Sequence, residues 1–152
     1  MMSEKRMYPG CAVFCGKIVV SGGERDTLSS KTVEVYDHCS NKWSRMPDML
    51  ERRHCHASVG IKNKLYMIGG SSKECEVFDS FSQKFSYIKS AFPCYEFCSF
   101  SLFSTKYATI SNTIRIYVGR NSYATVLDVE TEEWSDENGI KFRKWPLKLF
   151  YC

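Results

Sequence analysis

The sequence has no apolar run approaching the ~18 residues of a membrane-spanning helix, so we expect no transmembrane segment. Apolar residues do not recur at helical spacing over any stretch of about ten residues, so we expect almost no helix. The first residues lead into no apolar stretch of about seven residues, which argues against a secretory signal peptide. The excess of positive over negative charge is also small. Lys and Arg number 21 against 17 Asp and Glu, and the net charge of +4 is spread along the 152 residues.

Sequence signals for catalysis are missing as well. Neither G-x-x-x-x-G-K-[ST] nor G-x-G-x-x-G occurs, and no Cys, His and Asp are spaced as a recognisable nucleophilic triad. We therefore expect no enzyme and no cofactor. His54, Cys55 and His56 look like a metal cluster, and Cys94 and Cys98 look like a ligand pair. A structural zinc site needs four ligands at set spacings, and these groups would meet only by accident of the fold, so we predict no metal site.

Two charged segments offer alternatives. The carboxylates between residues 128 and 137 are interpreted as a solvated turn, with a cation site as the sharper alternative. In segment 136–152, Lys and Arg alternate with apolar residues, which suits an edge strand better than a nucleic-acid surface. That segment is either the last strand of a repeat with the start of another, or an unrelated end. We expect no nucleic-acid partner and no membrane partner.

Residues that favour strands and build cores are abundant. Hydrophobic residues make up 43% of the chain and aromatic residues 14%, which predicts a globular, strand-rich protein. The 8 cysteines accompany no export signal, and several lie in apolar, strand-like runs. We interpret them as reduced thiols of a cytoplasmic protein. The length predicts one domain, residues 1–152.

A repeat organises the chain. Residues 10–23 (GCAVFCGKIVVSGG) align without a gap to residues 57–70 (ASVGIKNKLYMIGG), and a fainter third copy covers residues 106–119 (KYATISNTIRIYVG). The first two copies end in glycine doublets, and the third keeps one glycine of its doublet: Gly22, Gly23, Gly69, Gly70 and Gly119. Because glycine has no Cβ, the doublets are expected to end a strand with positive φ and close backbone approach.

A second landmark follows each copy. Two large side chains are separated by six residues, and an Asp follows the first of them. The pairs are Tyr36 and Trp43, Phe78 and Phe85, and Leu127 and Trp134. In the second copy the pattern predicts strands over residues 56–61, 64–68, 74–79 and 84–88, with Asn63 in the first turn. Four short antiparallel strands per ~50 residues are typical of a propeller blade.

These residues resemble the kelch repeat, whose pattern is hydrophobic residues, a glycine doublet, and a Tyr and a Trp six residues apart. The resemblance implies an all-β fold, a partial kelch-type β-propeller of about three four-stranded antiparallel blades. We expect the blades near residues 6–50, 53–92 and 95–150. Tyr36, Trp43, Phe78, Phe85 and Trp134 are then packing residues. Arg6 and Arg53, which precede the innermost strands, are expected to donate to backbone carbonyls between blades.

The resemblance implies a non-enzymatic protein-interaction module. It is similar to the substrate-binding kelch domain of cullin-type ubiquitin ligase adaptors, although the BTB and BACK domains of those adaptors are not recognisable here. The alternatives are an actin-binding, cytoskeletal kelch protein and a truncated copy without independent function. Closed propellers need about four to eight blades, so three blades leave uncovered edges through which self-association is expected.

Kelch domains usually bind partners through the loops between the second and third strands of each blade and through the starts of the innermost strands. The resemblance therefore implies the following partner-binding residues: Tyr8, Glu24, Arg25, Asp26, Cys55, Ser71, Ser72, Lys73, Arg120, Asn121 and Ser122. The first of these loops, residues 24–31, is expected to be long and flexible.

Overall fold

The described part of the chain is built from β-strands. The computed structural model describes residues 2–89, 104–110, 113–120 and 123–136, with side chains for residues 2–89 and 126–135. Within these ranges there is no helix, as the sequence predicted. The parts of the expected third blade at residues 95–103 and 137–150 lie outside the described residues.

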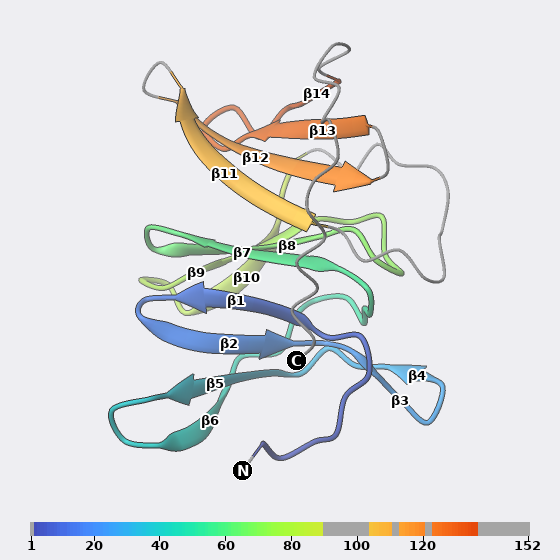
Figure 1. Ribbon diagram of the computed structural model, residues 1–152, viewed down its shortest axis with the longest axis vertical. Helices are drawn as coiled ribbons and strands as arrows, with labels where there is room; N and C mark the ends of the chain where they lie inside the picture. The colour runs from blue at the N-terminus through green and yellow to red at the C-terminus, as the bar shows by residue number, and fades with distance from the viewer. Residues whose placement is uncertain (1, 90–103, 111–112, 121–122, 137–152) are drawn as a thin grey trace.

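Three four-stranded antiparallel sheets stack in chain order (Figure 1). The first sheet has the order β1-β2-β5-β6. Its strands are β1 (Gly10–Phe14), β2 (Lys17–Ser21), β5 (Val33–Asp37) and β6 (Lys42–Met46). The second sheet contains β7 (Ala57–Ile61), β8 (Lys64–Ile68), β9 (Glu76–Asp79) and β10 (Lys84–Tyr87). The third contains β11 (Ser104–Ile110), β12 (Thr113–Arg120), β13 (Tyr123–Asp128) and β14 (Trp134–Asp136). The predicted fold class is confirmed.

The six-residue spacing of the aromatic landmarks has a direct cause in the register. Tyr36 lies opposite Trp43 across the β5–β6 ladder, and Phe78 lies opposite Phe85 across β9–β10. Their ring centroids are 5.2 and 5.1 Å apart, respectively. Leu127 lies opposite Trp134 in the same way. Each landmark pair is therefore a cross-strand pair that flanks one hairpin turn.

The Asp that follows each first landmark caps that turn. In the first sheet, Asp37 Oδ1 accepts the backbone N–H groups of Cys39 and Ser40 at 2.9 and 3.2 Å. Asp79 does the same for the N–H groups two and three residues on, and so does Asp128. The repeated Asp is therefore an Asx-turn residue that closes the outer hairpin of each sheet.

Every second side chain along the strands points into the space between the first and second sheets and fills it. Phe14 and Phe78 meet edge to face, with centroids 6.0 Å apart. The buried members of this core come from both sheets and from the segment between them: Phe14, Val19, Val33, Met49, Leu65, Met67, Phe78 and Phe85. The opposite face of the second sheet packs against Leu127 and Trp134 of the third through a second buried core. The second sheet is thus covered on both faces.

Glycines allow close approach of the innermost strands β1 and β7. A Cβ at Gly60 would overlap the carbonyl oxygen of Val13 and press on the Cα of Phe14. A Cβ at Gly10 would overlap the side chains of His56 and Ser58. Because neither glycine carries a side chain, the two strands can lie in backbone contact.

The glycine doublets lie just past β2 and β8, as expected. Their φ values are 57° and 92° in the first copy and 68° and 80° in the second. Gly23 donates its N–H to the carbonyl of Arg53 at 2.9 Å. A Cβ at Gly22 would overlap that same carbonyl. The first doublet therefore makes room for the segment that connects the first sheet to the second. Gly119 differs, because it lies inside β12 and pairs with Ser104 and Ala124.

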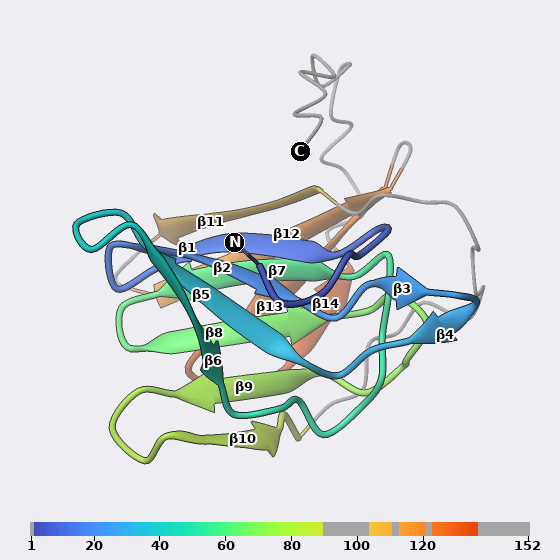
Figure 2. The same ribbon diagram turned by 90° about the horizontal axis from the view of Figure 1, so that it is seen from below.

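Two connections add local detail to the expectations. Asn63 lies in the turn between β7 and β8, as predicted, and Lys62 in the same turn has positive φ (51°). The loop expected over residues 24–31 contains a small hairpin, formed by β3 (Glu24–Arg25) and β4 (Leu28–Ser29). It projects from the side of the molecule opposite the β5–β6 turn (Figure 2). Its residues lack a clear alternating pattern, and its order depends on contacts from distant segments.

Candidate functional site: the loop face and its clamps

The β3–β4 hairpin is held to the rest of the molecule at its base. Met7 and Glu24 exchange backbone hydrogen bonds of 2.9 and 2.7 Å. Ser29 Oγ lies 2.8 Å from His54 Nδ1. At the tip, Arg25 and Asp26 form an exposed ion pair of 3.3 Å, and Leu28 is exposed. The hairpin therefore presents charged and apolar side chains from a fixed base.

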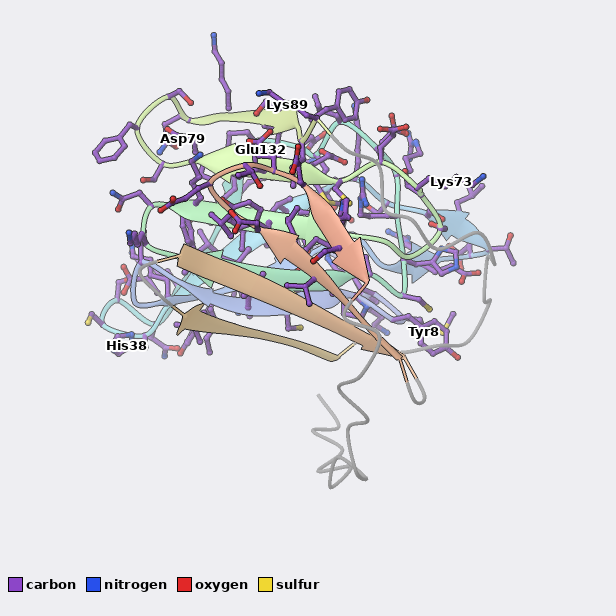
Figure 3. All side chains as sticks on the ribbon, turned by 90° about the horizontal axis from the view of Figure 1, so that it is seen from above. Tyr8, His38, Lys73, Asp79, Lys89 and Glu132 are labelled. Carbon is purple, nitrogen blue, oxygen red and sulfur yellow. The ribbon has the colours of Figure 1, made fainter. Side chains whose placement is uncertain are left out.

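His54 connects this hairpin to the second loop. Its ring bonds Ser29, while its backbone N–H donates to Ser71 Oγ and its carbonyl accepts the Ser71 N–H, both at 3.2 Å. Ser72 Oγ accepts the N–H of Glu74 at 3.3 Å. Figure 3 shows Tyr8 and Lys73 at one end of the molecule and His38 and Asp79 at the other. The first two predicted partner loops thus share one end, which we call the loop face (residues 7–8, 24–29 and 71–73).

The starts of the innermost strands carry a repeated backbone feature. Tyr8 and Cys55, at equivalent positions, both have a φ of 53°, and the Cys55 N–H donates to the Tyr8 carbonyl at 2.9 Å. Tyr8 is exposed, but Cys55 is only 5% exposed, and burial raises the pKa of its thiol. Cys55 therefore offers little surface to a partner, and we omit it from the loop face.

The third predicted loop is described only at its start. Arg120 is the last residue of β12, and its backbone pairs with Tyr123. Asn121 and Ser122 lie outside the described residues.

Arg6 and Arg53 are the centres of two equivalent clamps. Arg6 Nη1 donates to the carbonyls of Gly22 and Thr32 at 2.7 and 3.1 Å. Arg53 Nη1 donates to those of Gly69 and Glu74 at 3.1 and 2.9 Å. Each arginine therefore binds backbone carbonyls of the sheet that follows it.

Sequence reasoning missed the acidic member of each clamp. Arg53 Nη2 donates to Glu76 Oε1 at 2.6 Å, and both side chains are fully buried. Glu76 also accepts the backbone N–H groups of Leu50 and Glu51 at 2.6 and 3.0 Å. The sequence does contain a signal for these acidic residues. Glu34 and Glu76 each stand two residues before the first aromatic landmark of their copy. The segments that hold the arginines are also similar, because residues 2–6 read MSEKR and residues 49–53 read MLERR.

The first clamp has the same design. Glu34 accepts from Arg6 Nη2 at 3.0 Å and from the N–H of Ser3 at 2.7 Å. Burial alone would raise the pKa of Glu34, but the hydrogen bonds from Ser3 and Arg6 outweigh it and hold that pKa below its usual value. The carboxylate therefore stays charged and fixes the entering segment to the sheet.

A buried polar cluster lies between the first two sheets. Ser21 Oγ is 2.8 Å from His56 Nε2 and 3.0 Å from Ser58 Oγ. Burial, with the nearby charge of Arg53, lowers the pKa of His56 to about 3, so its ring is neutral at physiological pH. Ser21 is fully buried, and His56 Nδ1 has no hydrogen-bond partner among the described residues. A serine that no substrate can reach, beside a histidine with no orienting acid, does not make a catalytic pair.

The residues considered as possible metal ligands do not come together in the structure. His54 bonds Ser29, whereas His56 bonds Ser21 between the sheets. Ligand atoms of Asp37, His38 and Cys39 lie within 4.8 Å of one another. The Asp37 carboxylate, however, already bonds Lys17 at 2.8 Å and caps its own turn. Its pKa falls to about 2, first because of Lys17. A cation would have to compete with that ammonium group.

Stacked four-stranded antiparallel sheets with clamped connecting segments define a repeat protein of the propeller class. Comparison with protein families gives the same result, because Kelch motif models match residues 5–50 and 52–90, together more than half of the chain. The chain belongs to the kelch-repeat family.

Individual relatives match only in part. Kelch-like protein 25 of Xenopus tropicalis is 34% identical over 76 residues, which is 50% of this chain and 13% of that protein. Kelch-like protein 25 of Homo sapiens is 33% identical over the same shares. Kelch repeat protein C2 of Vaccinia virus (strain Western Reserve) is 32% identical over 45% of this chain and 14% of its own length. The chain thus spans a small part of the curated relatives it matches. No helix in the described residues has the length and hydropathy to cross a membrane.

Proposed function

We propose that this chain is a non-enzymatic protein-binding module whose docking surface is the loop face. Kelch domains generally bind proteins, and the kelch motifs of this chain cover both described loops of that face. The observation that carries the proposal is the anchoring of two loops by one residue. His54 joins the β3–β4 hairpin to Ser71, so exposed Arg25, Asp26 and Leu28 stand on a fixed base. A preorganised loop surface loses less conformational entropy on binding than a flexible one.

Membership of the kelch-repeat family supports a finer proposal. We propose that the chain presents a substrate-like protein in the manner of kelch-type ubiquitin ligase adaptors, or competes with them, in the cytoplasm. Cys15, Cys39 and Cys55 are free thiols, which suits a reducing compartment. Arg120, Asn121 and Ser122 complete the proposed docking residues from the third loop.

Site-specific photo-crosslinking tests the docking surface. Crosslinkers at Arg25 and Ser72 should capture the same protein from a cell extract, and Arg25→Glu should weaken its binding to the purified chain. A crosslinker at Phe81, exposed on the β9–β10 turn at the other end, is the matched control. Equal capture from Phe81, or binding indifferent to Arg25→Glu, would refute the loop face. Co-sedimentation with actin filaments that depends on Arg25 would favour the cytoskeletal alternative, and absence of any partner would favour a copy without independent function.

A further inference from the structure

One row of apolar side chains crosses the outer face of the first sheet. Val13 pairs with Ile18, Ile18 with Tyr36, and Tyr36 with Trp43, so the row runs through all four strands. Phe14, Val19 and Val35 alternate with it and point toward the second sheet. Val13 is 68% exposed and Ile18 46%. We call these four residues the first-sheet flank.

The second sheet carries the equivalent row, and there the row is covered. Gly60 pairs with Leu65, Leu65 with Phe78, and Phe78 with Phe85. Leu65, Phe78 and Phe85 are buried against the first sheet. The clamp at Arg6 and Glu34 also repeats the clamp at Arg53 and Glu76, which stands at the boundary between the two sheets. The first-sheet flank is therefore built as a sheet-packing surface.

The difference at the innermost position of the two rows limits what can cover the flank. Where the second sheet has Gly60, the first has Val13, and a Cβ at Gly60 would overlap the backbone of the neighbouring innermost strand. A sheet that docked on the flank as the first sheet docks on the second would therefore collide with the Val13 side chain. Val13 and Ile18 need a partner that meets them with side chains at ordinary sheet-to-sheet distance, about 10 Å.

The third sheet of a second copy offers little apolar surface at the one far-face position whose exposure is described. Leu127 packs against the second sheet, so alternation turns Val126 to the far face of the third. Val126 is only 1% exposed. A flank that docked there would gain little contact from this residue.

We propose that the first-sheet flank is a homodimer interface, in which two copies pack flank against flank about a two-fold axis. Such isologous contacts are the commonest in oligomers, because one self-complementary patch serves both chains. The rim carries both signs in balanced pairs, Lys17 with Asp37 at 2.8 Å and Arg45 with Asp48 at 3.2 Å, so two like rims can approach without a large excess of one charge.

The size of the flank sets the strength of the dimer. Four strands of five residues span about 17 by 19 Å, a patch smaller than the ~800 Å² per partner of a standard interface. The dimer should therefore be weak, reversible and concentration-dependent. It uses a different surface from the loop face, so it stands or falls independently of the proposed docking function.

Sedimentation equilibrium of the full chain tests the proposal. The wild type should form a reversible monomer–dimer equilibrium between low and high micromolar concentration. Val13→Glu and Ile18→Glu should each weaken dimerisation by about tenfold or more, since a charge would be buried at the axis. Phe81→Glu is the matched control, because Phe81 is 80% exposed but lies on the second sheet's turn, and it should dimerise as the wild type does. Circular dichroism and urea unfolding should show all variants folded.

The variant Val13→Gly distinguishes two possible partners of the first-sheet flank, the flank of a second copy and a neighbouring sheet packed as in a propeller. It removes contact area from a flank-to-flank dimer and should weaken it, whereas it would open the flank to a propeller-like neighbour and strengthen association with one. A wild type that is monomeric throughout, assembly beyond the dimer, stronger association of Val13→Gly, or flank variants that dimerise normally would each overturn the proposal.

Discussion

Burial of a single imidazole makes the stability of this protein depend on pH. His56 is enclosed between two sheets, and that burial lowers its pKa from 6.5 to about 3. The unfolded chain takes up a proton at position 56 as the pH falls below about 6.5, while the folded chain does not until about pH 3. Acid therefore favours the unfolded state throughout that window.

We expect the free energy of unfolding to fall by about 1.4 kcal/mol per pH unit below about pH 6.5 on account of His56. Urea unfolding between pH 7.5 and about pH 5 measures it. His56→Gln should flatten this dependence whatever its absolute stability. His38→Gln, which removes an exposed histidine instead, should leave it in place. The depressed pKa values of Asp37 and Asp79 act in the same direction but below about pH 4.

A second residue-scale prediction concerns the buried clamp. Arg53→Met leaves the Glu76 carboxylate without its cation, and we expect a loss of about 3–5 kcal/mol. The double variant Arg53→Met/Glu76→Met should recover part of that loss, because no charge remains buried. Arg45→Met, which breaks the exposed pair with Asp48, should cost no more than about 1 kcal/mol. Equal costs at both arginines in urea unfolding would contradict the clamp.

At the scale of strands and turns, the repeat made most of the architecture predictable. The spacing of Tyr36 and Trp43 is the length of one hairpin, and the β8 strand has the expected bounds, Lys64–Ile68. The acidic clamp residues were not predictable in the same way. A glutamate inside a strand usually marks the solvent face, and only the incoming N–H groups and guanidinium reverse that expectation for Glu34 and Glu76. The β3–β4 hairpin was missed because Met7 and His54 order it from outside.

The equivalent aromatic pairs of the first and second sheets should contribute unequally to the free energy of unfolding. Phe78 is buried between the sheets, so Phe78→Ala should cost about 3–5 kcal/mol. Trp43 belongs to the flank and is only partly buried, so Trp43→Ala should cost clearly less in the monomer. Urea midpoints measured at low protein concentration compare the two variants. A larger loss from Trp43→Ala would mean that the first sheet has the more buried pair.

The contact between β1 and β7 can be tested at Gly60. Gly60→Val reproduces the residue found at the equivalent Val13, but here the side chain meets the backbone of β1. We expect a loss of about 1–3 kcal/mol or more, since backbone cannot move aside as a flexible side chain can. Val13→Ala, at the exposed counterpart, should change stability little. A tolerated Gly60→Val would show that the innermost strands are further apart than described.

At the scale of the whole molecule, three sheets in series bury their surfaces unequally. The second sheet is covered on both faces, whereas the first keeps an apolar row exposed on its outer face. The family and the strand pattern were accessible from sequence because they repeat. The anchoring of the proposed docking loops was not, since it depends on contacts between distant segments, such as those of His54 with Ser29 and Ser71.

The clamps also determine where one unit can be exchanged for another. Residues 49–53 bond to the sheet that follows them, through Glu76 and the carbonyls of Gly69 and Glu74, although they come directly after the previous sheet. A chimaera joined ahead of Met49 would carry each arginine together with its own glutamate. A junction placed at Arg53 would instead pair a transplanted carboxylate with a foreign connecting segment. The natural cut point for recombining such modules is therefore upstream of the arginine, before the chain leaves one layer for the next.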